Sequence, residues 1–150
     1  MSIRYTHTNI ISKDWQKLVK FYQDVFNCKR VPPERDFTGD WLSKCTGVKN
    51  ASLKGIHLRL PGHGDDGPTL EILQYDEIAE KPTPKSNREG YGHIAFHVDD
   101  VDLIYEKALI HGGKQLGEVV KKEIEGVGLL TLVYMTDPEG NIIEIQNWGN

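Results

Sequence analysis

The sequence has little of several features that mark large protein classes. Its only 2 cysteines, Cys28 and Cys45, are too few for a disulfide framework. No apolar run is long enough to span a membrane, and the first residues carry no apolar signal core. Basic residues are scattered, and the net charge of −4 argues against a nucleic-acid surface. We therefore expect a cytoplasmic protein that binds neither membranes nor nucleic acids.

The composition is that of an ordinary globular chain, with 38% hydrophobic and 27% charged residues. A chain of 150 residues is long enough for one domain, or for two small modules that share a core. A chain of this size buries about two-thirds of its unfolded surface, so it needs no disulfide or structural metal to fold.

An internal repeat is the main feature of the sequence. His7 and His93 each open a short apolar run, and Asp14 and Asp100 follow at the same spacing, where each is suited to cap a helix. Each half then closes on a strand-like segment with a Glu between apolar residues. The pattern predicts two copies of one unit that begins at a His and ends at a Glu.

Apolar periodicity and turn residues predict the elements of the first half. In chain order these are a strand at 5–12, a helix at 15–26, an edge strand at 30–37, a short helix at 40–46, and strands at 51–60 and 69–75. Asn27 is suited to end the first helix, and Pro32-Pro33 favours an edge position. In the short helix, Trp41 and Leu42 are expected to be buried.

The second half is predicted to repeat this order. The expected elements are a strand at 91–98, a helix after Asp100, strands at 114–124 and 128–136 joined by a tight Glu-Gly turn, and a strand at 141–148. The inward positions of the helix are expected to be Val101, Ile104, Ala108 and Leu109. Proline-rich sequence separates the halves, which places module one at about 3–78, a linker at about 79–89 and module two at about 90–150.

Four residues stand out as candidates for chemistry: His7, Glu71, His93 and Glu144. Each Glu lies between two apolar strand residues, so alternation places it on the opposite sheet face from them. On the helix-covered face the carboxylate would be buried without a partner, so we expect each Glu on the other face. The same alternation applies to the two histidines. If the two duplicated sheets face each other, two imidazoles and two carboxylates come together.

Two imidazoles and two carboxylates suit a divalent metal such as zinc, nickel, cobalt, manganese or iron. A single His or Glu on a strand is usually a solvated surface residue, and it is the repetition that favours a shared metal site. Candidates for contact with an anionic substrate are His57, Arg59, His97 and Arg30. Surface ion pairing is an equally good reading for the two arginines, and a space-filling role is an equally good one for the two histidines.

Two segments resemble a known family. Tyr91-Gly-His-Ile-Ala95 is similar to the second metal-ligand strand of bacterial glyoxalase I, and Asp137-Pro-Glu-Gly-Asn-Ile-Ile-Glu144 resembles the ending of the vicinal oxygen chelate superfamily. The resemblance covers nearly the whole chain. It implies an α+β fold in which two tandem βαβββ modules form cupped mixed β-sheets around a metal. The implied ligands are His7, Glu71, His93 and Glu144.

The resemblance also implies an activity. We expect a metal-dependent, glyoxalase I-like lyase or isomerase that removes a proton next to a carbonyl and forms a metal-stabilised enediolate of a small-molecule substrate. Glu144 is the first candidate for the base and Glu71 the second. An epimerase of acyl thioesters, like methylmalonyl-CoA epimerase, is one alternative, and a resistance protein that sequesters its ligand without turnover is another. Relatives with this fold imply a homodimer.

Overall fold

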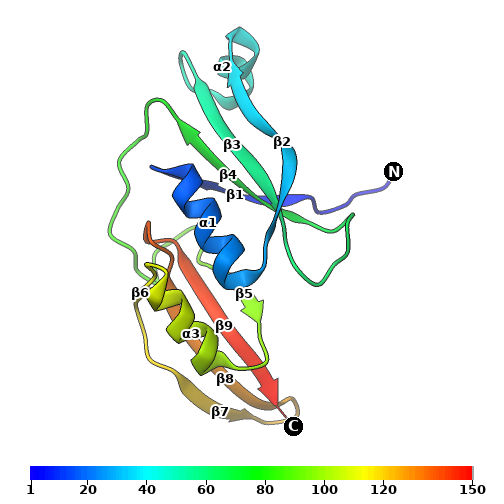
Figure 1. The fold of residues 1–150 in the computed structure, drawn as a ribbon, viewed down its shortest axis with the longest axis vertical. Coiled ribbons are helices and arrows are strands. Elements are labelled where there is room, and N and C mark those ends of the chain that lie inside the picture. Colours follow the sequence, from blue (N-terminus) through cyan, green and yellow to red (C-terminus); the bar gives the residue numbers. More distant parts are fainter. Residues whose placement is uncertain (150) are drawn as a thin grey trace. The chain divides into compact units, whose positions relative to one another are not determined.

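Two units make up the chain in the computed structural model, which describes residues 1–149. Unit 1 is Met1–Lys81 and unit 2 is Pro82–Asn150, and Figure 1 labels the elements of each. The boundary lies inside the segment 79–89 that the sequence predicted as a linker. That the two units form one domain stays a prediction, and each unit is described here by itself.

Unit 1 contains one mixed sheet and two helices. Its elements are β1 (His7–Ile11), α1 (Trp15–Phe26), β2 (Lys29–Thr38), α2 (Asp40–Thr46), β3 (Ser52–Arg59) and β4 (Thr69–Tyr75). The strands lie in the order β1-β4-β3-β2, with β1 parallel to β4 and the other neighbours antiparallel. The segment with Pro32-Pro33 is an edge strand, as the sequence predicted.

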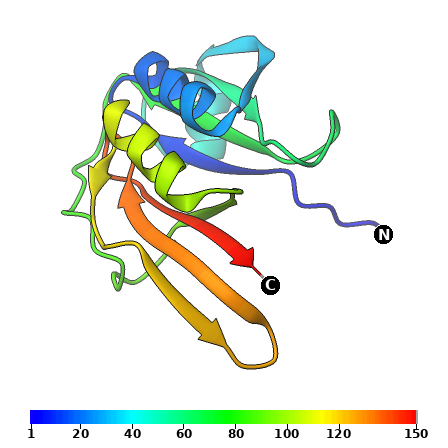
Figure 2. The same ribbon diagram turned by 60° about the horizontal axis from the view of Figure 1, so that its bottom comes forward.

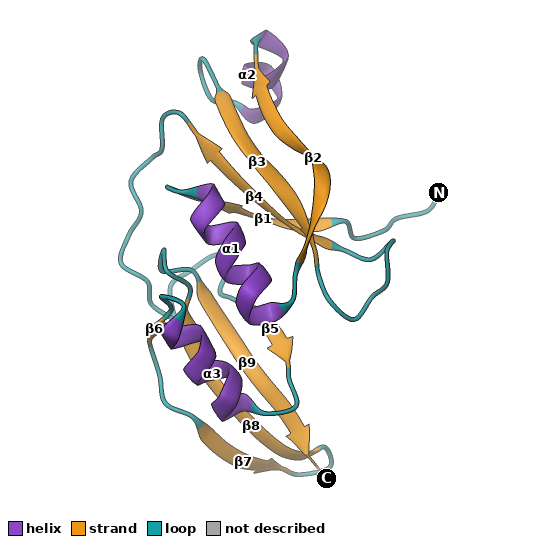
Figure 3. Cartoon of the chain, in the orientation of Figure 1, coloured by secondary structure: helices purple, strands orange, loops and turns teal. Residues whose placement is uncertain are grey.

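Helix α1 covers one face of this sheet, and its sequence explains both its ends. The Asp14 side chain accepts a hydrogen bond from the Lys17 N–H at 3.2 Å, and Asn27 ends the helix with a left-handed φ of 56°. Its buried residues are Val19 and the stripe that the apolar periodicity predicted, Trp15, Leu18, Phe21, Tyr22, Val25 and Phe26. The helix lies against β3 and β4 (Figure 3), where Leu58, Leu70 and Ile72 are fully buried.

Helix α2 follows β2 and precedes β3 in the chain. Leu42 is buried in a small cluster with Ala51, Leu53 and Leu73. Trp41 is 55% exposed and its ring meets that of Phe37 edge-on, so the prediction that it is buried was wrong. Successive helical residues point about 100° apart, and a helix of two turns has one inward direction, which Leu42 occupies.

Unit 2 repeats the arrangement of unit 1. Its elements are β5 (Ile94–His97), α3 (Val101–Ile110), β6 (Lys114–Gln115), β7 (Val120–Ile124), β8 (Gly128–Thr136) and β9 (Ile142–Gly149). The sheet order is β5-β9-β8-β6, and β7 also pairs with β8. Strand β5 is parallel to β9, as β1 is to β4. Figure 2 shows the hairpin of β7 and β8.

Three details of unit 2 differ from the prediction. The strand expected at 91–98 is shorter, so His93 lies just ahead of β5, after Gly90 and Gly92. The strand expected at 114–124 is interrupted between β6 and β7, where the Gly117 N–H bonds the Tyr134 carbonyl at 2.9 Å. Helix α3 buries Val101 and Ala108, but Leu109 is exposed, because it lies about 100° around the helix from Ala108.

The turn before β9 is built on a buried carboxylate. Asp137 is fully buried and accepts hydrogen bonds from the backbone N–H groups of Glu139 (2.8 Å) and Asn141 (3.0 Å) and from the Asn141 side chain (2.8 Å). These bonds fix where β9 begins, and therefore where Glu144 lies.

The structure is an α+β fold with mixed sheets of 4 and 5 strands, as expected from the sequence. Among residues 1–149, none of the helices is both long and apolar enough to cross a membrane. A cytoplasmic location stays a prediction.

Candidate functional site

Each candidate Glu lies on the sheet face opposite its unit's main helix. Glu71 is flanked by Leu70 and Ile72, both with 0% exposure, while its own side chain is 17% exposed. Glu144 is flanked by Ile143 and Ile145, also with 0% exposure, and its side chain is 12% exposed. The facing predicted from strand alternation is therefore correct in both units.

The His–Glu register is the same in both units. Asn9 of β1 pairs with Glu71, and Ala95 of β5 pairs with Glu144. His7 and His93 each lie two positions before these partners. Because side chains alternate along a strand, each His is on the same face as the Glu of the neighbouring parallel strand. The repeat seen in the sequence is thus a repeat of geometry.

In unit 1, two imidazoles face one carboxylate, and we call His7, His57 and Glu71 the unit 1 cluster. His7 Nε2 is 3.6 Å from Glu71 Oε1, and His57 Nε2 is 2.8 Å from Glu71 Oε2. The two rings meet edge to face, with centroids 5.1 Å apart. Thr6 Oγ1 is 3.1 Å from His7 Nδ1, and Thr69 Oγ1 is 2.7 Å from His57 Nδ1.

His57 is held in a neutral state. Burial lowers the pKa of His57, the Glu71 charge raises it, and Arg35 and His7 lower it again, with a net lowering. A neutral imidazole has one N–H donor and one acceptor nitrogen. Nε2–H then donates to Glu71, while Nδ1 accepts from the Thr69 hydroxyl, so both ring nitrogens are satisfied.

In unit 2, one imidazole faces the carboxylate, and we call His93 and Glu144 the unit 2 pair. His93 Nε2 is 3.0 Å from Glu144 Oε2. The residue that pairs with Glu144 on β8 is Tyr134, whereas the residue that pairs with Glu71 on β3 is His57. The Tyr134 ring lies 4.7 Å from the His93 ring, centroid to centroid. Burial and the Glu144 charge raise the pKa of Tyr134, so its phenol stays protonated at neutral pH.

The other predicted contact residues are dispersed. His57 belongs to the unit 1 cluster. Arg30 pairs with Glu34 at 2.6 Å and lies over the Trp15 ring. His97 is exposed at the end of β5 and has no hydrogen bond or ion pair from its side chain to any part of the chain that the structure describes.

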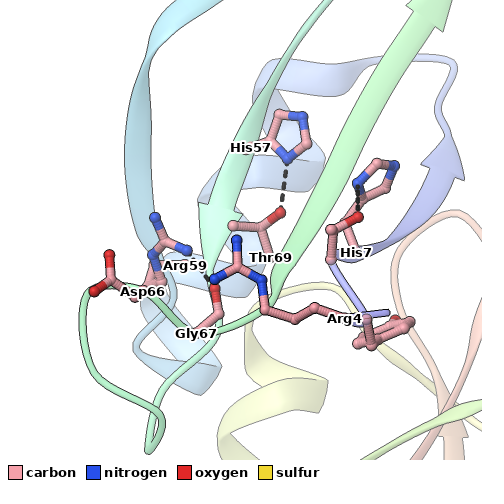
Figure 4. Close-up of a pocket in the computed structure, with 9 residues that line it drawn as sticks. Arg4, His7, His57, Arg59, Asp66, Gly67 and Thr69 are labelled. Carbon is pink, nitrogen blue, oxygen red and sulfur yellow. Dashed lines mark hydrogen bonds between the residues drawn. The ribbon is translucent and has the colours of Figure 1, made fainter. Parts of the chain in front are cut away.

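Arg59 lies beside the unit 1 cluster and lines a pocket of about 230 Å³. Figure 4 shows the pocket residues, all from unit 1: Arg4, Tyr5, Thr6, His7, His57, Arg59, Asp66, Gly67 and Thr69. Sequence reasoning missed Arg4, Thr69 and Tyr134. Alternation along β8 would have placed Tyr134 on the Glu144 face, but the segment before β1 has no periodicity that singles out Arg4.

Imidazole nitrogens and carboxylate oxygens are donor types that bind divalent metals. Two ligands about 2.1 Å from one ion lie about 3.0–3.4 Å apart in octahedral or tetrahedral geometry. The His–Glu distances of 3.6 Å and 3.0 Å are close to these values. No group of three His, Cys, Asp or Glu within residues 1–149 is arranged to hold a metal by itself. Each unit contains one His–Glu pair.

Solved structures with the same fold come from several functional classes. A glyoxalase family protein from Bacillus cereus is 20% identical with a TM-score of 0.77, and the match covers 99% of this chain and 94% of that one. Trypanothione-dependent glyoxalase I from Leishmania major is 23% identical with a TM-score of 0.61, covering 97% and 87%. The fosfomycin resistance protein FosX from Listeria monocytogenes, solved with Mn(II) and a dihydroxypropylphosphonic acid, is 20% identical with a TM-score of 0.53, covering 97% and 92%.

These identities establish a shared fold and leave the reaction open. No curated protein matches the sequence. The sequence model of one family, described as the Glyoxalase/Bleomycin resistance protein/Dioxygenase superfamily, matches residues 4–145. That match spans nearly the whole chain and includes both His–Glu pairs. The chain belongs to the Glyoxalase/Bleomycin resistance protein/Dioxygenase superfamily.

Proposed function

We propose that this protein is a metal-dependent lyase or isomerase of the glyoxalase I type. The observation that carries the proposal is the repeated register: in both units a His lies two positions before the strand partner of a Glu, and the two side chains meet. The His–Glu contact is the same in both copies, although the residue on the other side of each Glu differs, His57 in one and Tyr134 in the other. We infer that His7, Glu71, His93 and Glu144 are ligands of one divalent metal, which the two pairs supply together.

The neighbouring side chains support this role. Thr6 occupies Nδ1 of His7, which leaves Nε2 to face Glu71. His57 holds the second oxygen of Glu71, and ligand carboxylates commonly have such outer partners. When bound, a divalent ion such as zinc, nickel, cobalt, manganese or iron would polarise a substrate carbonyl and stabilise an enediolate.

The two carboxylates are held differently, which suggests different roles. Glu71 contacts an imidazole at each of its oxygens. Glu144 contacts one imidazole, and the neighbouring Tyr134 is a protonated phenol. We therefore infer that Glu144 is the base that takes a proton from the carbon next to the carbonyl and returns it, and that Glu71 stays a fixed ligand.

The test is a metal analysis of the purified protein, followed by solvent deuterium exchange into a panel of hemithioacetals of 2-oxo aldehydes and of acyl thioesters that carry a hydrogen on C2. We expect one metal per chain and a product with one exchanged position. Deuterium exchange into an acyl thioester without net product would instead show that the protein is an epimerase of acyl thioesters. A protein that binds its ligand, holds no metal and shows no exchange would be a sequestering protein, and the proposal would fail.

We also propose that the protein is a homodimer. In each unit the sheet ends in an edge strand, with β2 at one edge of the first sheet and β6 at an edge of the second. Such edges are normally covered, charged or paired. Light scattering at micromolar concentration should give twice the chain mass, and a monomer would contradict the proposal.

A further inference from the structure

The pocket in unit 1 brings two guanidinium groups together. Arg4 precedes β1 and Arg59 is the last residue of β3, and both line the pocket of about 230 Å³. In Figure 4 the two side chains reach toward each other at the side of the pocket away from the histidine rings. We propose that this pocket binds an oxyanion, the carboxylate or phosphonate group of a small substrate.

Neither guanidinium is committed to a carboxylate. Arg59 donates through Nη1 to the Gly67 carbonyl, which fixes its position and leaves its other N–H groups for a ligand. Arg4 makes no hydrogen bond or ion pair with any residue from 1 to 149. Two neighbouring positive groups without a counter-ion are the arrangement that binds carboxylates and phosphonates through paired N–H donors.

The remaining lining also favours a single anion. Asp66 is the only acidic residue of the lining, and no ion pair joins it to either arginine. Figure 4 places it on the side of Arg59 that faces away from Arg4. Among the lining residues, two arginines stand against one aspartate, and the adjoining Glu71 carboxylate, which is outside the lining, is paired with His57 at 2.8 Å.

The pocket directly adjoins the unit 1 cluster, because His7 and His57 line it too. Its volume lies below the range of about 300–1,000 Å³ typical of sites for drug-sized ligands, so a small head group fits better than a bulky one. A molecule anchored here would have its negative charge next to the His7–Glu71 pair. The substrate class is then a small molecule that carries a free carboxylate or phosphonate group. The inference that the pocket binds an oxyanion depends only on the pocket residues. The inference that this oxyanion belongs to the substrate rests on the proposed function.

The experiment is an NMR titration of the metal-free, full-length protein with inorganic phosphate, acetate and neutral acetamide, followed on the arginine Nε–Hε signals. Phosphate and acetate should bind saturably and acetamide should not. Arg4→Gln should weaken phosphate binding about tenfold or more, since one charge-assisted pair is lost. Arg4→Gln combined with Arg59→Gln should abolish binding. Arg88→Gln is the matched control, because Arg88 also donates to a backbone carbonyl, that of Thr83 at 2.8 Å, but outside the pocket.

The outcomes separate this inference from the proposed function. Wild-type affinity in Arg4→Gln, or equal weakening in Arg88→Gln, would overturn the oxyanion pocket. Arg4 has no partner in the described chain, so Arg4→Gln stays informative if Arg59→Gln fails to fold. Arginine-dependent phosphate binding in a protein that never takes up metal would leave the pocket standing and remove the proposed reaction. Metal uptake without arginine-dependent anion binding would do the reverse.

Discussion

Units 1 and 2 share their strand order but surround their glutamates differently. In each unit the His that meets the Glu lies at the start of the parallel neighbouring strand or just ahead of it. The residue on the antiparallel neighbour is His57 in unit 1 and Tyr134 in unit 2. A duplicated backbone has thus kept one contact and changed the other. We assign the shared His–Glu contact to metal binding. We assign the differing neighbour, His57 or Tyr134, to setting the role of each carboxylate as fixed ligand or base.

The surroundings of the two glutamates differ as well. In unit 1 helix α2 covers the far end of the Glu71 face, where Leu42 packs on Leu73 and Tyr75 lies against the same cluster. Unit 2 has no helix between β6 and β8 in the part of the chain that the structure describes. The open pocket with Arg4 and Arg59 is likewise a feature of unit 1. Unit 1 is therefore the unit that we expect to recognise the substrate, and unit 2 supplies the proposed base.

The largest expected effect comes from exchanging the two carboxylates for amides one at a time. Glu144→Gln should lower turnover about a hundred- to ten-thousand-fold while metal stays bound, because it removes the base and keeps an oxygen ligand. Glu71→Gln also keeps an oxygen ligand but removes no base, so its turnover should fall only in proportion to metal occupancy and recover in excess metal. Metal analysis and deuterium exchange on both variants decide this. A metal-loaded Glu144→Gln variant with the wild-type exchange rate would move the base to Glu71.

The second comparison is between two histidines of unit 2. His93→Ala should remove the metal, because it deletes a proposed ligand that contacts Glu144 at 3.0 Å. His97→Ala, which deletes an exposed imidazole on the same strand face, should keep the metal. His7→Ala should match His93→Ala if the two units are equivalent. Equal metal loss in His93→Ala and His97→Ala would show that the ligand is misplaced.

The third comparison concerns the residues opposite the glutamates. His57→Ala leaves one oxygen of Glu71 without its imidazole partner and should weaken metal binding about 10–100-fold, as loss of an outer partner does. Tyr134→Phe keeps the ring against His93 and should change metal affinity less. Competition with a chelator measures both. If Tyr134→Phe costs more than His57→Ala, the roles assigned to the two units are reversed.

The fourth comparison tests the helix found only in unit 1. Leu42→Ala should lower the free energy of unfolding by about 2–5 kcal/mol, because Leu42 is buried against Leu73. Trp41→Ala should cost less, since Trp41 is largely exposed. Urea unfolding monitored by circular dichroism gives both values. A larger loss from Trp41 would mean that another surface covers it in solution.

The smallest expected effect comes from the two helix N-caps, which occupy the same place in both units. Asp14 and Asp100 cap α1 and α3 through backbone bonds of 3.2 Å and 3.0 Å. Asp14→Ala and Asp100→Ala should each cost about 1 kcal/mol of unfolding free energy. Thermal unfolding measures both values. The metal content of both folded variants should equal that of the wild type. A large difference between the two would show that the units do not share their local stability as they share their fold.

Local patterns in the sequence were sufficient for much of the fold. Both N-caps, the Asn27 helix end, the α1 stripe and the facing of Glu71 and Glu144 are properties of a few neighbouring residues, and all were predicted correctly. The errors arose where tertiary packing decides. Trp41 and Leu109 each lie next to a position that packs inward, and the sequence does not say how much of a helix the rest of the chain will cover.

The candidate site divides in the same way. The sequence by itself determined which residue types recur and which face of a strand each occupies, because alternation and helix period are set by backbone geometry. Only the tertiary structure decided that His57 lies across from Glu71 and Tyr134 across from Glu144, because cross-strand register depends on the turns that join the strands. It alone placed Arg4 beside Arg59, since these residues lie far apart in the chain and no local pattern links them.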